Sequence, residues 1–356
     1  MTSRFFSSTL AVGTLLVVFF VHPFAYVGAK TANFSHFGSN DVQYDDSNAS
    51  SDRGVESDSA IDANTANASG SNDSDARAGS NGDASPWLKL ERDERGVPLR
   101  LATSIVRFEG EFRAADGETR PVSIDLIGAI HLGEASYYER LNAEFKEYET
   151  VVFELVAEEG FDVKDLAAAK ESKNKRGASP LDAVSFLQQS LSDALGLVYQ
   201  TDGVDYSAPN LKRGDADADD FLVRLTTGGD IPLFFANSSL ESLFASENGR
   251  FEGWALAYFL AKDKRLTLRR LVADELARTE LAGDPDARET ALIHFRNEIA
   301  TDVVKKELEA GKTEIAVFYG AAHLDDLARR IEKTLTNSRR LEPRWITAWS
   351  MEPTAK

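Results

Sequence analysis

Two matched segments of the chain each place a histidine just after an apolar run that breaks at a glycine. The first is Gly128-Ala-Ile-His131 and the second is Gly320-Ala-Ala-His323. Each run is rich in β-forming residues and is followed by a helical pattern, which predicts a strand, a sharp turn and a helix start. In parallel α/β sheets, ligands and catalytic groups gather at the carboxyl ends of the strands. The chain has only five histidines, so we expect His131 and His323 to act in one site.

A helix amino end disfavours positive charge, so an imidazole there is expected to stay neutral. Neutral imidazoles serve as metal ligands or general bases. The structural alternative is that His131 and His323 each cap a helix or fill a gap in the core through one hydrogen bond.

Glu154 is the natural third member of the site, because it directly follows the apolar run Thr-Val-Val-Phe. A charge in that place is costly unless it is paired or exposed. This run follows the first histidine segment through a single helix, so we expect the two strand ends to be neighbours in the sheet. Two imidazoles and one carboxylate match the ligands of catalytic zinc and of other divalent metals. The alternative for Glu154 is a salt bridge to an arginine.

Arg296 lies among apolar residues in a helical pattern before the second histidine segment. It is expected to orient Glu154 or to stabilise a developing oxyanion, and the alternative is an exposed helix charge. Glu158 or Glu159 could move a proton, although a solvated acidic loop is the simpler interpretation. Three residues of the central loop, expected over 203–217, are weaker candidates that could line a cleft: Tyr206, Asn210 and Asp215.

The elements that must position these groups predict one α/β (α+β) domain over residues 86–356. Its mixed central sheet is built from the two strand–Gly-x-x-His–helix units. A hairpin of strands over 99–112 and 121–127 leads into the first unit, because a turn sequence separates two β-prone runs. Residues 156–312 are expected to form a mainly helical insertion, and 344–350 a final strand.

The N-terminal region is expected to target the protein for export rather than to form part of the fold. Residues 1–29 have an early arginine, an apolar stretch and a small-residue end, as in a signal peptide. We therefore expect export to the periplasm, the cell envelope or the medium, the alternative being an uncleaved helix that anchors the protein to a membrane. Residues 30–85 are rich in Ser, Asn and Asp and too poor in apolar residues to form a core, which predicts a disordered acidic leader.

Composition excludes several classes of function. The net charge is −18 and the folded part has no basic stripe, so we expect no nucleic-acid partner. The absence of cysteine removes disulfides, thiolate nucleophiles and iron–sulfur clusters. The serine-hydrolase elbow, the His-Glu-x-x-His motif, the Walker loop and the dinucleotide-binding glycine fingerprint are also missing.

The paired Gly-x-x-His elements, Glu154 after the second strand and Arg296-Asn297 in a late helix resemble the TraB/PrgY/GumN family. This family includes the Tiki Wnt-inactivating proteases, and the resemblance covers roughly residues 98–350. It implies the fold of a metal-dependent hydrolase or peptidase. Tiki members are manganese- or cobalt-dependent peptidases, and pheromone-shutdown members act on small signalling peptides.

These observations predict an exported metal-dependent hydrolase, a peptidase acting on a peptide or another small molecule. His131, Glu154 and His323 would hold a divalent ion (Mn, Co, Zn or Fe) that lowers the pKa of bound water. Arg296 would stabilise the tetrahedral oxyanion. The alternative is a non-catalytic binding module that sequesters a peptide or a haem-like ligand in the same cleft. A third interpretation, a structural envelope protein, predicts no bound metal.

Overall fold

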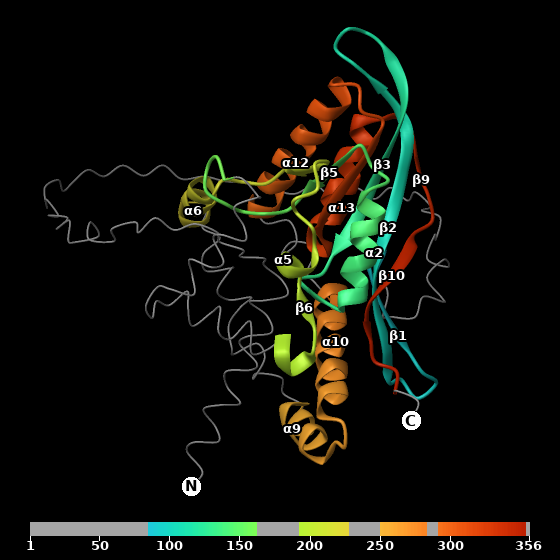
Figure 1. The fold of residues 1–356 in the computed structure, drawn as a ribbon, viewed down its shortest axis with the longest axis vertical. Coiled ribbons are helices and arrows are strands. Elements are labelled where there is room, and N and C mark those ends of the chain that lie inside the picture. Colours follow the sequence, from blue (N-terminus) through green and yellow to red (C-terminus); the bar gives the residue numbers. More distant parts are fainter. Residues whose placement is uncertain (1–84, 162–191, 228–249, 283–290, 354–356) are drawn as a thin grey trace, which may run out of the picture. The chain divides into compact units, whose positions relative to one another are not determined.

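The structure is a computed structural model that describes residues 85–161, 192–227, 250–282 and 291–353 (Figure 1). The predicted signal peptide (1–29) lies outside the described residues, and so does the predicted leader apart from Ser85. Parts of the predicted helical insertion lie outside them as well.

A long hairpin forms the framework of the sheet. Its arms are β2 (Pro98–Arg113) and β3 (Thr119–Ala129), which pair antiparallel from Arg113↔Thr119 to Ile105↔Ile127. Gly117 has φ 90° in the turn between them, a conformation that glycine adopts readily. The predicted hairpin is therefore confirmed. Three further strands also pair antiparallel with β2: β1 (Leu88–Arg92), β9 (Thr336–Arg340) and β10 (Arg344–Ser350).

The other half of the sheet is parallel. The order of the whole sheet is β1-β2-β3-β8-β5-β7, and in its second half β8 (Glu314–Gly320) is parallel to both β3 and β5 (Thr150–Phe153). The predicted mixed α/β sheet is confirmed. The expectation that β3 and β5 are neighbours is wrong, because β8 inserts between them. The carboxyl ends of β3, β8 and β5 nevertheless share one edge of the sheet.

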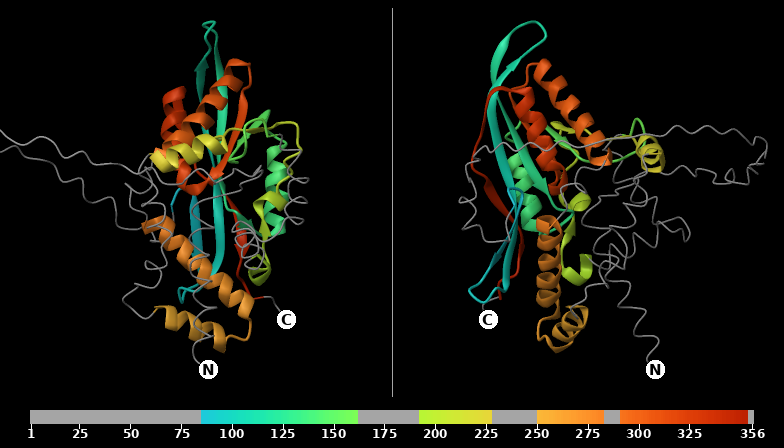
Figure 2. Two further views of the ribbon diagram at one scale, coloured as in Figure 1. Left: turned by 90° about the vertical axis from the view of Figure 1, so that its left-hand side faces the viewer. Right: turned by 180° about the vertical axis from the view of Figure 1, so that it is seen from behind.

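Alternating side chains of β8 enter two different cores. Ala316 and Phe318 belong to one apolar cluster, and Ile315, Val317 and Tyr319 to the other, as expected for a strand buried on both faces. Helix α2 (Ala135–Phe145) contributes to the first cluster, while α12 (Ala291–Glu309) and α13 (Ala321–Thr334) contribute to the second. Figures 1 and 2 show these helices around the sheet.

The described part of the predicted insertion is mainly helical but is joined to the sheet. Strand β7 (Leu211–Arg213) pairs parallel with β5 at the sheet edge. Part of the predicted central loop is therefore a strand. Besides α12 and β7, the described part of the insertion includes the two-residue strand β6 (Val198–Tyr199) and the helices α5 (Gln200–Gly203), α6 (Ala218–Thr227), α9 (Arg250–Leu260) and α10 (Lys264–Ala282).

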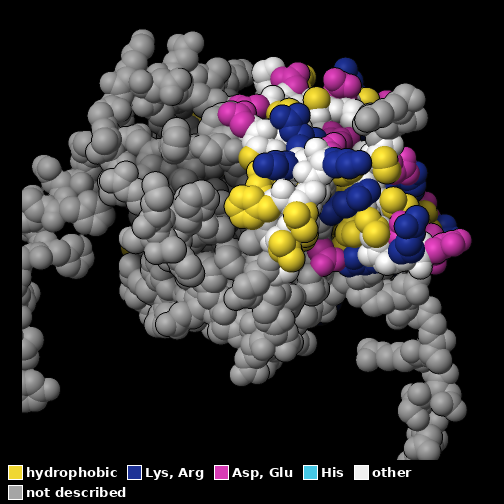
Figure 3. All heavy atoms as spheres, turned by 90° about the horizontal axis from the view of Figure 1, so that it is seen from below, with side chains coloured by type: hydrophobic (Ala, Val, Ile, Leu, Met, Phe, Trp, Pro, Cys, Tyr) yellow, Lys and Arg dark blue, Asp and Glu magenta, His cyan; other side chains and the backbone are white. Residues whose placement is uncertain are grey.

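Helix α9 presents an apolar surface to solvent. Leu256, Phe259 and Leu260 are 60, 61 and 74 % exposed. Figure 3 views the molecule from this end and shows apolar side chains beside Lys and Arg on the described part. None of the described helices is long and apolar enough to cross a bilayer. Helix α9 contributes no candidate site residue.

Candidate functional site

The two Gly-Ala-x-His segments fold differently. Strand β8 ends at Gly320, α13 begins at Ala321, and His323 lies buried in the first turn of that helix. After β3, the chain bends at His131 and enters the short strand β4 (Leu132–Gly133) before α2 begins at Ala135. The expectation that both histidines lie at a helix start is therefore wrong for His131. Pairing of β4 with β6 draws this segment into a second, two-stranded sheet before the helix.

Glu154 is buried directly after β5, where it bridges two elements. Its Oε2 accepts a hydrogen bond from the Gly320 backbone N–H at 2.8 Å, and its Oε1 accepts one from Arg296 Nη2 at 2.7 Å. Burial by itself raises the pKa of this carboxyl, but its charged and hydrogen-bonding surroundings, led by Arg296, outweigh burial and hold the pKa at about 2. Glu154 is therefore an ionised carboxylate, and the salt bridge considered as its alternative is present.

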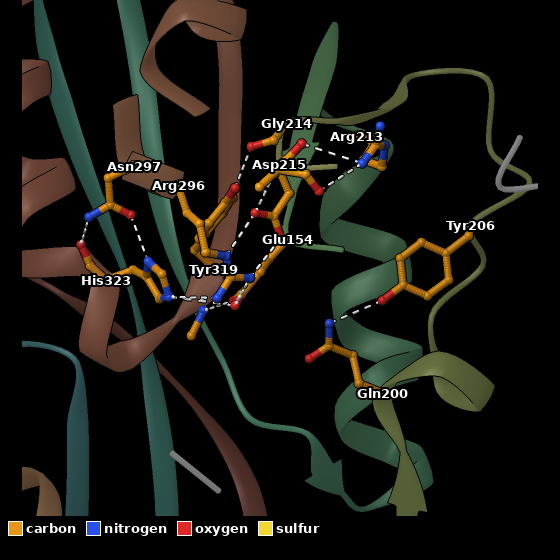
Figure 4. Close-up of polar contacts among 12 residues, drawn as sticks. Glu154, Gln200, Tyr206, Arg213, Gly214, Asp215, Arg296, Asn297, Tyr319 and His323 are labelled. Atoms are coloured by element: carbon orange, nitrogen blue, oxygen red, sulfur yellow. Dashed lines mark hydrogen bonds and ion pairs between the residues drawn. The ribbon is translucent and has the colours of Figure 1, made fainter. Parts of the chain in front are cut away.

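Arg296 on α12 is held from the other side by Asp215, two residues after β7. Arg296 Nε donates to Asp215 Oδ1 at 2.8 Å, and Nη2 donates to Asp215 Oδ2 at 2.7 Å. This two-point geometry fixes the plane of the guanidinium (Figure 4). Burial lowers the pKa of Arg296, but Asp215 and Glu154 outweigh it and raise the pKa overall. The alternative of an exposed helix charge is wrong.

Hydrogen bonds to Asn297 fix the orientation of the His323 ring. Asn297 Nδ2 donates to the His323 carbonyl at 3.1 Å and to Asp326 Oδ2 at 3.0 Å. Both partners are acceptors, so they identify the NH2 group and leave Asn297 Oδ1 as the acceptor that faces His323 Nδ1, 2.7 Å away. Nδ1 therefore carries a proton, and in the neutral form of the ring Nε2 carries the lone pair.

The lone pair of His323 faces the charged cluster. Nε2 lies 3.6 Å from Glu154 Oε1 and 3.4 Å from Arg296 Nη1. The Tyr319 ring packs edge-on against the imidazole, with ring centroids 5.3 Å apart, and its hydroxyl donates to the Gly214 carbonyl. A nitrogen lone pair, a carboxylate and a guanidinium thus converge at the carboxyl ends of β8 and β5.

His131 interacts electrostatically with two members of this cluster. Burial lowers the pKa of its imidazole and Arg296 acts in the same direction, while Glu154 opposes both. Glu154, Arg296 and His323 contact one another, whereas His131 interacts with Glu154 and Arg296 electrostatically. Within the described ranges, no three His, Asp or Glu side chains form a group that could hold a metal ion. The predicted metal site therefore stays a prediction.

The structure places the remaining residues predicted from the sequence in different surroundings. Asp215, a weak cleft candidate, lies at the centre of the cluster. Asn210 instead donates to the carbonyls of Phe145 and Tyr148, which is a structural role. Glu158 is half-buried and Glu159 exposed. Gln200, which is buried and donates to the Tyr206 hydroxyl, is not among the residues that the sequence indicates, because a lone polar residue in a region of mixed pattern carries no sequence signal.

Gly214 brings β7 close enough to β5 to place Asp215. A Cβ at this position would lie 2.2 Å from Val152 Cγ1. We therefore expect Gly214→Ala to lower the free energy of unfolding by about 1–3 kcal/mol through overpacking, measured by urea denaturation. Gly253→Ala is the matched control, because no atom lies within 4 Å of its added Cβ and alanine favours a helix by about 1 kcal/mol. Equal losses in both variants would contradict this account.

Comparison with protein-family models finds no match to this chain. Curated proteins and solved structures give no match either. The assignment of function therefore depends on the chemistry of the cluster itself.

Proposed function

We propose that this protein is an exported metal-dependent hydrolase that cleaves peptide bonds at the carboxyl ends of β3, β8 and β5. One observation carries the proposal. His323 Nε2 and Glu154 Oε1 lie 3.6 Å apart in a buried position, and Asn297 holds the imidazole in the tautomer that presents a lone pair. The order of the motifs, which resembles that of the TraB/PrgY/GumN family, supports the same function.

The donor atoms suit a divalent ion. Imidazole nitrogen and carboxylate oxygen are the ligands of catalytic zinc, and a ligating histidine usually donates its second N–H to a fixed acceptor, as His323 does to Asn297. His323, Glu154 and His131 would hold the ion. Arg296 is the cation that neutralises Glu154 in this structure, and its two bonds to Asp215 keep it anchored if Glu154 Oε1 takes another partner.

The bound ion would supply a water of lowered pKa, about 7 in comparable sites. The protein's own groups supply the rest. Asn297 orients His323, and the Gly320 N–H holds Glu154 Oε2. Arg296, aligned by Asp215, is a fixed donor beside the cluster that can stabilise the negative oxygen of a tetrahedral intermediate.

Metal binding and turnover test the proposal together. Purified protein is incubated with Mn²⁺, Co²⁺ or Zn²⁺, its metal content is measured after desalting, and cleavage of a mixed peptide library is followed by mass spectrometry. We expect retained metal and cleavage that stops with EDTA while the circular dichroism spectrum is unchanged. His131→Ala and His323→Ala should each lower the metal content.

The other outcomes separate the alternatives. Equal metal content in the wild type and both histidine variants would exclude the proposed ligand set. Peptide or haem binding that EDTA leaves intact, without any product, would instead support a sequestering module.

A further inference from the structure

His131 directly precedes β4, and Gln200 directly follows β6, the strand that pairs with β4. The strands pair as Gly133↔Val198 and Leu132↔Tyr199, and beyond the last pair the Gln200 backbone N–H donates to the His131 carbonyl at 2.8 Å. This backbone hydrogen bond holds residues 131 and 200 next to each other.

One end of the Gln200 carboxamide is anchored. Gln200 Nε2 donates to the Tyr206 hydroxyl at 3.0 Å. Tyr206 is itself fixed by packing against Phe153, with ring centroids 5.0 Å apart. The amide plane is thus set by a core contact next to Glu154. Figure 4 shows the amide oxygen pointing away from Tyr206, to the side on which the Glu154–Arg296 cluster lies.

The other end of the amide lacks a partner. Gln200 is 4 % exposed, and among the described residues its Oε1 is buried without a hydrogen bond. An unsatisfied buried acceptor costs about 1–3 kcal/mol, so it calls for an explanation. Gln200 also opposes the lowering of the His131 pKa, as an acceptor beside the ring should.

We propose that Gln200 is the positioning residue of His131: its Oε1 accepts the ring N–H of His131 and so turns the other ring nitrogen toward Glu154. Asn297 does the same for His323, so each histidine of the cluster has its own side-chain amide. The inference extends the proposed metal site, because outer partners of this kind set the tautomer and orientation of ligating imidazoles.

The test follows the His131 ring directly. Ring ¹⁵N shifts are recorded on the full-length, metal-free protein labelled with ¹⁵N-histidine, and the His131 signals are assigned by their loss in His131→Gln. We expect a single tautomer in the wild type, a mixture in Gln200→Leu, and a single tautomer again in Gln200→Glu, which keeps an acceptor. Asn210→Leu is the control, since it removes a structural amide outside the site and should leave the tautomer unchanged.

Metal affinity provides the second measurement. A Zn²⁺ titration of Gln200→Leu should give binding about 10- to 100-fold weaker than that of the wild type. An unchanged His131 tautomer in Gln200→Leu would overturn the inference, whatever the loss of stability. If that variant fails to fold, Tyr206→Phe, which releases the amide from its anchor, decides by the same ring shifts.

Failure of the proposed function is distinguishable from failure of this inference. A wild-type protein that binds none of the three metals would remove the hydrolase proposal, while the ring shifts still decide the role of Gln200. A wild type that binds metal, beside a Gln200→Leu variant of equal affinity and tautomer, would leave the hydrolase standing and reject Gln200.

Discussion

Arg296→Met is expected to lower the free energy of unfolding by about 3–5 kcal/mol, because it leaves buried carboxylates without their cation. Arg296 bonds to both Asp215 and Glu154, and both acids are buried. Methionine retains the apolar stem, so most of the loss reflects charge rather than packing. Urea denaturation at pH 7 measures the effect.

The pH dependence identifies the cause. In the wild type the pKa of Glu154 is about 2, against an ordinary value of 4.5. Its contribution to stability is therefore present above pH 4.5 and is lost as the pH falls toward 2. Without Arg296, burial raises the pKa of Glu154, so the variant should gain stability relative to the wild type as the pH falls below 7.

Two further variants complete the test. Arg339→Met removes an exposed ion pair to Glu109 on the sheet surface and should cost less than 1 kcal/mol, as surface pairs do. Adding Glu154→Gln and Asp215→Asn to Arg296→Met should recover part of the loss. A loss at Arg296 no larger than at Arg339 would mean that the cluster is solvated rather than buried.

Local pattern predicted the long elements because their apolar residues have a clear period. Strand β8 alternates between two cores, and β10 was predicted with the bounds that it has. Strand β9 has the sequence TNSRR and is exposed throughout. It exists because its backbone pairs with β2, and such pairing leaves no hydrophobic signal. The same holds for the three-residue strand β7, which burial pattern alone could not reveal.

The candidate site was predictable in its membership but less so in its connections. Glu154 had to be paired or exposed on energetic grounds alone, and Arg296 was named as its partner. The insertion of β8 between β3 and β5 is a tertiary choice that no local pattern records. It is also the reason why His323, rather than His131, contacts Glu154. Asp215 stayed a weak candidate because its role depends on that same sheet order.

His323→Asn is expected to reduce peptide hydrolysis by about 10³-fold or more, since loss of a metal ligand removes several kcal/mol of transition-state stabilisation. The asparagine amide can still donate to Asn297 Oδ1 in place of the Nδ1–H, but nothing replaces Nε2. His294→Asn is the matched control: this histidine is 37 % exposed in its side chain and pairs with Asp326 at 3.3 Å, so turnover should stay within about twofold.

The complementary substitution separates orientation from ligation. In His323→Gln, the longer side chain places its amide near the position of Nε2, and no group replaces the Nδ1 donor. The amide oxygen then takes the place of the imidazole nitrogen as the metal ligand. We expect this variant to retain more metal than His323→Asn while binding it more weakly than the wild type, because its orientation by Asn297 is lost. Metal content and initial cleavage rates on one peptide measure both properties. Equal turnover in His323→Asn and the wild type would show that Nε2 takes no part in the reaction, because that substitution removes this atom while keeping the bond to Asn297.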